Sequence, residues 1–445
     1  MSFEAVDTYV VDGIKVSILK FQLPLDYSNP ETSIDICVKL VNNRHSDQIS
    51  FCYQTDLLDN IDKVFLYLEG GPGYESAFPV VGTVPTYLSA LLDKGYTVIL
   101  LDQRGTGLSS PLQLSKLTSF DSPEEQLEFL NLFRADSIVN DCEQIRRILL
   151  GEQKWSLLGQ SYGGFCSTCY CSRFPDSIKK VFITGGLPPL TGTVEQVATN
   201  NLTATKRKTL EYYAEFPNDE HRIARILDYL ATSCPTLPNG GTLSRNRFQH
   251  LGTYFGASGG FTFVHKLVTT MTLELDSTGQ LSYKTLELLQ NCSGFETNLL
   301  HFLYQENIYM NGPGKSTNWT VERVKKQLYG DKFFFTSEHH YSELCNDYHR
   351  LQSLKPLLDL LHSTTDWRQI WNIETLKTFT PAKLPIYCMV FYDDQYVSTE
   401  LSLANETIFP FKRVITSEFL HDGVKSNGHE VLDKLFQLSL GNYIR

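Results

Sequence analysis

Alternating and continuous runs of apolar residues in the first part of the chain predict a β-sheet. Residues 13–43 alternate apolar and polar side chains, and Pro24 and Pro30 break the pattern, which is typical of antiparallel strands joined by turns. The later runs are short and continuously apolar, as expected of strands that are buried on both faces. These later runs lie at residues 64–68, 96–101, 155–158 and 180–184.

Segments with helical spacing separate the later runs. Within residues 123–150, an apolar residue recurs every three or four positions, which would place Ile138, Cys142, Ile145 and Leu149 on one face of a helix. Another helix is predicted after residue 161. Because strands and helices alternate along the chain, we expect parallel pairing and an α/β sheet.

The pattern changes near residue 190. Residues 191–380 show long, polar, aromatic-rich helical patterns with few signs of strands. Strands return at residues 384–392 and 413–416, and apolar spacing predicts a closing helix over 431–440. We therefore predict a core formed by residues 1–190 and 381–445, and a helical cap domain inserted between them as residues 191–380.

A glycine-rich turn stands where one of the buried strands ends. Gly159-Gln-Ser-Tyr-Gly163 fits the G-x-S-x-G pattern, with a predicted strand before it and a predicted helix after it. This is the context of a nucleophile elbow, in which small neighbours allow a serine to adopt a strained turn. The sequence therefore predicts that Ser161 is a nucleophile.

A serine nucleophile needs a base, and the base needs an orienting acid. In an α/β-hydrolase the acid and then the histidine follow the serine along the chain. Asp394 fits the acid because it follows the strand that ends near residue 392, but spacing alone does not separate it from Asp393. His421 and His429 compete as the base, and we favour His421, since it follows the last predicted strand in a loop.

Backbone N–H groups would stabilise the negative oxygen of the transition state. One donor should be the residue after the nucleophile, Tyr162, and the other should come from the loop after an earlier strand. Gly70 and Gly71 lie in such a loop.

Composition narrows the classes of partner. The 445 residues carry a formal net charge of −11 without a dense basic stretch, which argues against nucleic acid and anionic membranes as partners. The start lacks the features of a secretory signal, and the ten cysteines lack zinc-like spacing. We expect a cytoplasmic protein that needs no metal or organic cofactor, and the oligomeric state stays open.

Further motifs occur in order along nearly the whole chain. Together they make it resemble the proline iminopeptidases (prolyl aminopeptidases), in particular the longer branch of this α/β-hydrolase family of serine peptidases. The motifs are Gly70-Gly-Pro-Gly73, Asp102-Gln-Arg-Gly-Thr-Gly107, Gly159-Gln-Ser-Tyr-Gly-Gly164, Thr184-Gly-Gly-Leu-Pro-Pro189, Phe255-Gly-Ala-Ser-Gly-Gly260, Tyr304-Gln-Glu-Asn-Ile-Tyr309, Phe335-Thr-Ser-Glu338, Asp394-Gln-Tyr-Val397 and His421-Asp-Gly423.

The resemblance implies an α/β-hydrolase fold with a mostly parallel sheet and a mostly helical cap, and an enzyme that releases N-terminal proline from peptides. It implies the catalytic residues Ser161, Asp394 and His421. It also implies that the N–H groups of Gly71 and Tyr162 form the oxyanion hole, and that cap residues Glu306 and Glu338 hold the substrate amino group. An aromatic-lined pocket is expected for the proline ring.

Two residues depart from the resemblance. Glu69 precedes the Gly-Gly-Pro-Gly motif, where histidine or glutamine is usual, and a charge there would oppose an oxyanion unless it is paired or points away. Ser337 stands where glycine is expected. Two alternatives therefore accompany the main hypothesis: a broader aminopeptidase or esterase on the same fold, and a binding protein with this fold and no catalytic activity.

Overall fold

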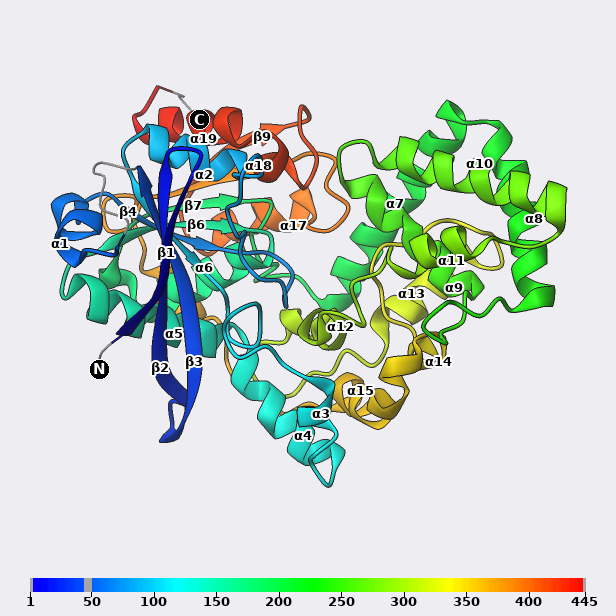
Figure 1. Cartoon of the computed structure of the whole chain (residues 1–445), viewed down its shortest axis with the longest axis horizontal. Helices are drawn as coiled ribbons and strands as arrows, with labels where there is room; N and C mark the ends of the chain where they lie inside the picture. The colour runs from blue at the N-terminus through cyan, green and yellow to red at the C-terminus, as the bar shows by residue number, and fades with distance from the viewer. Residues whose placement is uncertain (1–2, 44–49, 443–445) are drawn as a thin grey trace.

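A single twisted sheet organises the half of the molecule that lies at the left in Figure 1. In the computed structural model, which describes residues 3–43 and 50–442, nine strands pair in the order β1-β2-β3-β5-β4-β6-β7-β8-β9. The strands are β1 (Phe3–Val11), β2 (Ile14–Asp26), β3 (Asn29–Asn43), β4 (Val64–Leu68), β5 (Thr97–Leu101), β6 (Trp155–Gln160), β7 (Ile178–Thr184), β8 (Ile386–Phe391) and β9 (Lys412–Thr416).

The sheet is antiparallel at one end and parallel over the rest. β1, β2 and β3 pair antiparallel with one another, and β3 pairs antiparallel with β5. From β5 to β9 every pairing is parallel. The predicted strands are thus confirmed, and β1 is an additional one. Its edge position leaves most of its side chains partly or fully exposed, so its sequence carries little alternation.

Helices cover both faces of the sheet. Alternate residues of β4 point to opposite sides: Phe65 and Tyr67 join the apolar cluster under α2 and α19, whereas Leu66 and Leu68 join the cluster under α5 and α6. The helices outside the long insertion are α1 (Tyr53–Asp56), α2 (Thr86–Asp93), α3 (Leu114–Leu117), α4 (Pro123–Leu130), α5 (Ala135–Leu150), α6 (Tyr162–Arg173), α17 (Thr399–Ala404), α18 (Gly423–Ser426) and α19 (Gly428–Ser439).

The single helix that the spacing predicts over residues 123–150 is interrupted. α4 ends at Leu130, and α5 begins only after Arg134, whose backbone is extended. The buried guanidinium of Arg134 donates hydrogen bonds to the carbonyl oxygens of Asn307 (3.1 Å) and Met310 (2.6 Å). The break therefore places a cation where it fixes part of the insertion to the core.

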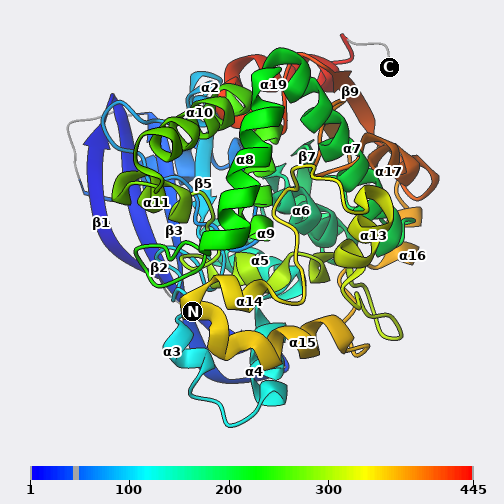
Figure 2. The ribbon, with the colours of Figure 1, turned by 90° about the vertical axis from the view of Figure 1, so that its right-hand side faces the viewer.

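Between β7 and β8 the chain forms helices and connecting loops. Helices α7 to α11 lie together on one side of the sheet, at the right in Figure 1 and facing the viewer in Figure 2. These helices have their own apolar cluster, which includes Tyr212, Phe248, Phe255 and Phe335. The division into core and cap domains stays a prediction. The insertion contains α7 (Val194–Glu215), α8 (Asn218–Ser233), α9 (Arg245–Gln249), α10 (Gly260–Thr278), α11 (Tyr283–Gln290), α12 (Leu299–Tyr304), α13 (Thr320–Tyr329), α14 (Leu344–Asp347), α15 (Lys355–Ser363) and α16 (Ile373–Lys377).

Within residues 3–43 and 50–442, no helix is both long and apolar enough to cross a bilayer.

Candidate active site

Ser161 lies in a strained turn at the carboxyl end of β6. Its backbone φ is 53° and ψ is −123°, a combination that is costly for a residue with a side chain. The flanking glycines make the turn possible. A Cβ on Gly163 would lie 1.9 Å from the carbonyl oxygen of Leu68, and one on Gly159 would lie 2.4 Å from that of Gly163. The local sequence thus produces the elbow that the pattern predicts.

Asp394 and His421 form a hydrogen-bonded pair after the last two strands. His421 Nδ1 is 2.6 Å from Asp394 Oδ2. The other carboxylate oxygen, Oδ1, accepts the N–H groups of Tyr396 (2.8 Å) and Val397 (3.0 Å), which fixes the acid within its turn. The side chain of Asp394 is 1% exposed and that of His421 is 13% exposed. Such a buried carboxylate holds an imidazole in one orientation and stabilises its protonated form.

The competing residues point elsewhere. Asp393 pairs with Arg207 of α7 at 2.8 Å, and its side chain is 39% exposed. His429 is the second residue of α19, and its side chain is 55% exposed, 3.8 Å from a carboxylate oxygen of Asp93. Neither side chain is among those that line the cavity containing Ser161.

Ser161 and His421 lie on the walls of the same cavity and next to the same strand end. The N–H of Ser161 donates to the carbonyl oxygen of Thr184 at 3.0 Å. A Cβ added to the following residue, Gly185, would lie 3.2 Å from Nδ1 of His421. The side chain of Gln160 also reaches the histidine, because its Nε2 donates to the carbonyl oxygen of His421 at 3.4 Å. The parallel strands thus bring Ser161, Asp394 and His421 to one edge of the sheet.

The loop after β4 lies directly against Ser161. A Cβ on Gly70 would lie 3.0 Å from Cβ of Ser161. The N–H of Gly70 is occupied, since it donates to Oε1 of Glu69 at 2.7 Å. The N–H of Gly71 has no acceptor among the described residues. Tyr162 is the first residue of α6, where backbone N–H groups lack acceptors within the helix. The free N–H groups of Gly71 and Tyr162 therefore suit an oxyanion.

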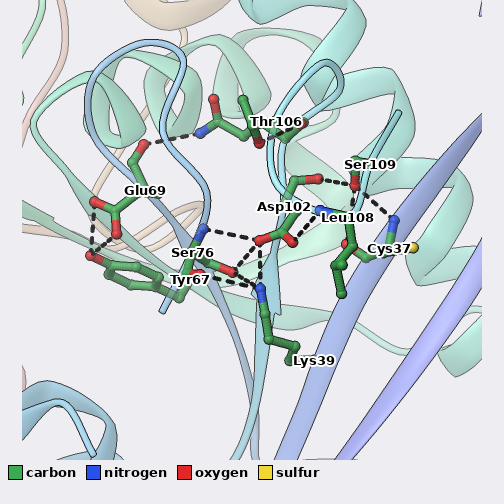
Figure 3. A network of polar contacts seen from close by, with 10 residues as sticks. Cys37, Lys39, Tyr67, Glu69, Ser76, Asp102, Thr106, Leu108 and Ser109 are labelled. Carbon is green, nitrogen blue, oxygen red and sulfur yellow. Dashed lines mark hydrogen bonds and ion pairs between the residues drawn. The ribbon is translucent and has the colours of Figure 1, made fainter. Parts of the chain in front are cut away.

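A buried ion pair and the hydrogen bonds around it hold this loop in place (Figure 3). Lys39 Nζ is 2.6 Å from Asp102 Oδ1, and both side chains are almost fully buried. The same oxygen accepts the N–H of Ser76 (3.0 Å) and its hydroxyl (2.8 Å). Gln103, the next residue, donates to the carbonyl oxygen of Glu69 at 2.9 Å. The loop is thus fixed at both ends by groups from the end of β5.

The cavity above Ser161 has a volume of about 370 Å³ and extends into the insertion. Both candidate residues for the substrate amino group, Glu306 and Glu338, line it. Glu306 precedes a short 3₁₀ helix (Asn307–Tyr309), and Glu338 lies in the loop between α13 and α14. The aromatic rings that line the cavity, which the sequence did not specify, are those of Tyr74, Tyr162, Phe165, Phe295, Tyr309 and Tyr396.

The two glutamates differ in their surroundings. Glu306 is 2% exposed; its Oε2 accepts the N–H of Thr320 at 3.1 Å, and its buried Oε1 has no partner among the described residues. Burial raises the pKa of Glu306 to about 8. Burial also acts to raise the pKa of Glu338, but the ion pair with His301 outweighs it, so the pKa of Glu338 is lowered.

Comparison with known proteins agrees with this geometry. Residues 63–224 match the α/β hydrolase fold family. Proline iminopeptidase aneH of Aspergillus aculeatus is 32% identical, over 97% of this chain and 96% of that protein. The proline iminopeptidase of Aeromonas sobria is 33% identical, over 97% of this chain and 98% of that protein. The chain belongs to the proline iminopeptidase family.

The predicted family and the predicted α/β-hydrolase fold are thereby confirmed. Similarity to solved structures is more distant. The proline iminopeptidase of Mycobacterium smegmatis is 14% identical, with a TM-score of 0.41 over 95% of this chain and 100% of that one. Esterase E22 is 10% identical, with a TM-score of 0.47 over 95% of this chain and 99% of that one.

The two departures from the proline iminopeptidase pattern have partners in the structure. The carboxylate of Glu69 is paired, because Lys425 Nζ lies 2.8 Å from its Oε1. The hydroxyl of Ser337 is 3.3 Å from that of Thr253 across the cavity wall. Sequence reasoning missed Lys425, and it also missed His301 as the partner of Glu338. Neither residue has a local signal, since each meets its glutamate only after the chain has folded.

The raised pKa of Glu306 leads to a prediction about stability. The folded protein keeps this proton up to about pH 8, whereas an unfolded chain releases it near pH 4.5. The unfolded state gains from ionisation as the pH rises through this window, so the free energy of unfolding falls. Glu306→Gln removes this effect and should stabilise the protein at pH 9 by about 2–4 kcal/mol relative to wild type.

Urea unfolding of wild type and Glu306→Gln at pH 4.5 and pH 9 would measure the difference. The two proteins should have similar midpoints at pH 4.5. A difference of equal size at both values would contradict the raised pKa.

Proposed function

We propose that the chain is a serine exopeptidase that releases N-terminal proline from peptides through an acyl-enzyme on Ser161. The observation that carries the proposal is a single cavity that is lined by Ser161 and His421 and also by two glutamates of the insertion, Glu306 and Glu338. The relatives from Aspergillus aculeatus and Aeromonas sobria are both named proline iminopeptidases, which supports the same reaction.

The proposed reaction begins with proton transfer from the Ser161 hydroxyl to the imidazole of His421, which Asp394 orients. The serine oxygen attacks the prolyl carbonyl, and the carbonyl oxygen becomes an anion held by the N–H groups of Gly71 and Tyr162. His421 then donates the proton to the leaving amine, and the C–N bond breaks. Water, deprotonated by His421, then attacks the acyl carbon. The bond between this carbon and the Ser161 oxygen breaks, His421 returns the proton to that oxygen, and proline is released.

The charges of the cavity suit a substrate with a free amino group. Among the described residues, its walls carry the carboxyl groups of Glu69, Glu306, Glu338 and Asp422, and Lys425 is the single lysine or arginine. A buried ammonium requires a carboxylate partner, and a substrate without the ammonium would leave that carboxylate unpaired. Glu338 and Glu306 are proposed to hold the amino group, and the aromatic rings to surround the proline ring. Because the pKa of Glu306 is raised to about 8 by burial, Glu306 would release its proton when the ammonium binds beside it, whereas the pKa of Glu338 is already lowered.

Peptides with an N-terminal proline are therefore the proposed substrates, whereas nucleic acids and membranes are not proposed as partners. We also propose a cytoplasmic location. All ten cysteines lie in the described part of the chain and are free thiols, which is typical of a reducing compartment.

The experiment that tests this function compares prolyl-p-nitroanilide, alanyl-p-nitroanilide and p-nitrophenyl acetate. Glu338→Gln and Glu306→Gln should each lower kcat/KM for the prolyl substrate about 10- to 100-fold and leave hydrolysis of the acetate ester within about threefold. Glu374→Gln is a matched control, because Glu374 is an exposed glutamate of α16 in the same insertion.

Equal or better turnover of the ester than of the prolyl substrate, unaffected by either glutamate variant, would favour the esterase alternative. Similar turnover of the alanyl and prolyl substrates would favour a broader aminopeptidase. No labelling of the native protein by a fluorophosphonate would favour a binding protein.

The pairing of Asp394 with His421 predicts unequal effects for two adjacent residues. Asp394→Asn should lower kcat about 10³- to 10⁴-fold, because the amide cannot stabilise the protonated imidazole. Asp393→Asn removes only a partly exposed pair with Arg207 and should change kcat less than about twofold. Steady-state kinetics with prolyl-p-nitroanilide would check both. The opposite order would assign the acid to Asp393.

A further inference from the structure

A buried carboxylate lies next to the proposed oxyanion hole and has no part in the proposed reaction. Glu69 directly follows β4, is 4% exposed and lines the catalytic cavity. Its Oε1 accepts the N–H of Gly70, and the hydroxyl of Tyr67 lies 3.4 Å from both carboxylate oxygens (Figure 3). A negative charge at this place would raise the free energy of an oxyanion formed beside Gly71.

The cation that faces this carboxylate comes from the segment that carries the base. Lys425 lies on α18, four residues after His421, and its Nζ is 2.8 Å from Oε1 of Glu69. The backbone of Lys425 is fixed as well, because its carbonyl oxygen accepts the hydroxyl of Thr86 at 2.8 Å. The ion pair thus joins the loop that offers the Gly71 N–H to the segment that offers the imidazole.

Gln160, the residue before the nucleophile, connects the same two segments. Its Nε2 donates to the carbonyl oxygen of His421, and its Oε1 would lie 2.5 Å from a Cβ on Gly70. Three segments that are distant in the sequence therefore meet at the Glu69–Lys425 pair and Gln160.

We propose that Glu69 and Lys425 are positioning residues for the acyl-transfer reaction, which makes this inference dependent on the proposed function. Glu69 holds the Gly70 N–H, so that the following N–H, that of Gly71, is left for the oxyanion. Lys425 neutralises Glu69 and fixes the loop relative to the His421 segment. Neither side chain takes or gives a proton in the reaction.

The two partners are not equivalent, which makes the proposal testable. The side chain of Glu69 is 5% exposed, whereas that of Lys425 is 48% exposed. Loss of the lysine leaves a buried, unpaired carboxylate beside the oxyanion. Loss of the charge on Glu69 leaves a lysine that solvent can hydrate, and a glutamine can still accept the Gly70 N–H. Lys425→Met should therefore be more harmful than Glu69→Gln, and Glu69→Gln should partly rescue Lys425→Met.

The experiment compares wild type, Glu69→Gln, Lys425→Met, the double variant and the charge-conserving Lys425→Arg. Lys434→Met is the control, because it removes a lysine of α19 whose ion pairs are with Glu418 and Glu430. The measurements are kcat and KM for prolyl-p-nitroanilide and the rate of labelling by a fluorophosphonate, which reports the serine and oxyanion hole without the substrate amino group.

Lys425→Met should lower kcat and the labelling rate about tenfold or more, with KM changed less than about twofold. The double variant should recover to within about threefold of Glu69→Gln. Lys425→Arg and the control Lys434→Met should stay within about twofold of wild type.

Two results would overturn the proposal. One is a double variant that is as slow as Lys425→Met or slower. The other is a Lys425→Met variant whose KM rises for the dipeptide Pro-Gly but not for the amide of this dipeptide, with kcat unchanged. That result would identify Lys425 as a binding group for a substrate carboxylate. Wild type that is labelled but does not cleave prolyl substrates would contradict the proposed function alone, and the labelling rates would still decide the role of the pair. Failure of wild type to be labelled would contradict both.

Discussion

Ser161→Ala is expected to lower kcat/KM for prolyl-p-nitroanilide by about 10⁴- to 10⁶-fold and to abolish labelling by a fluorophosphonate. The hydroxyl oxygen of Ser161 is the atom that would form the acyl bond, so its removal leaves the proposed reaction without a nucleophile. The variant should keep the fold, because alanine retains the Cβ that the turn at φ 53° already accommodates. Active-site titration and steady-state kinetics would measure the two effects.

A buried serine of α6, the helix that follows Ser161, provides the control. Ser172 is buried and its hydroxyl donates to the carbonyl oxygen of Cys169 within the same helix. Ser172→Ala should still be labelled, even if its stability falls. Labelling that persists in Ser161→Ala would place the reactive serine elsewhere and remove the basis of the proposed mechanism.

His421→Ala should lower kcat about 10³- to 10⁵-fold, because the Ser161 hydroxyl would lose both its base and the acid that protonates the leaving amine. His429→Ala should change kcat less than about twofold, since this side chain is exposed and lies 3.8 Å from a carboxylate of Asp93. Kinetics of both variants with the same prolyl substrate would check this pair of expectations. A large loss in His429→Ala with little loss in His421→Ala would exchange the two roles.

Features fixed by short stretches of sequence were predictable. The elbow depends on Gly159, Ser161 and Gly163, and the strands before and after it follow from continuous apolar runs. Because parallel strands end at one edge of the sheet, the order of strands also placed the acid and the histidine near the serine. The same reasoning failed over residues 123–150, where the apolar spacing is regular but the extended backbone of Arg134 interrupts the helix. There the side chain of Arg134 bonds to carbonyl oxygens of the insertion.

Features that depend on contacts between distant segments were not predictable. Asp393 and Asp394 are neighbours in one turn, and only the folded turn decides that one meets His421 and the other meets Arg207. In the sequence, the charge of Glu69 appeared unfavourable beside an oxyanion. Its partner Lys425 is distant along the chain, so only the folded structure shows that the charge is paired. Burial of Glu306, and with it the raised pKa, likewise depends on how the insertion folds over the core.

The insertion lines the cavity that contains Ser161, and this limits which polypeptides the enzyme can cleave. Carboxyl groups of the insertion line the same cavity as Ser161, and under the proposed function they hold a free N-terminal amino group, which a backbone that continues in both directions lacks. Folded proteins whose N-terminal residue is packed against the rest of the chain should therefore not be cleaved by the enzyme. Short peptides produced by other proteases have a flexible N-terminus and can enter such a cavity.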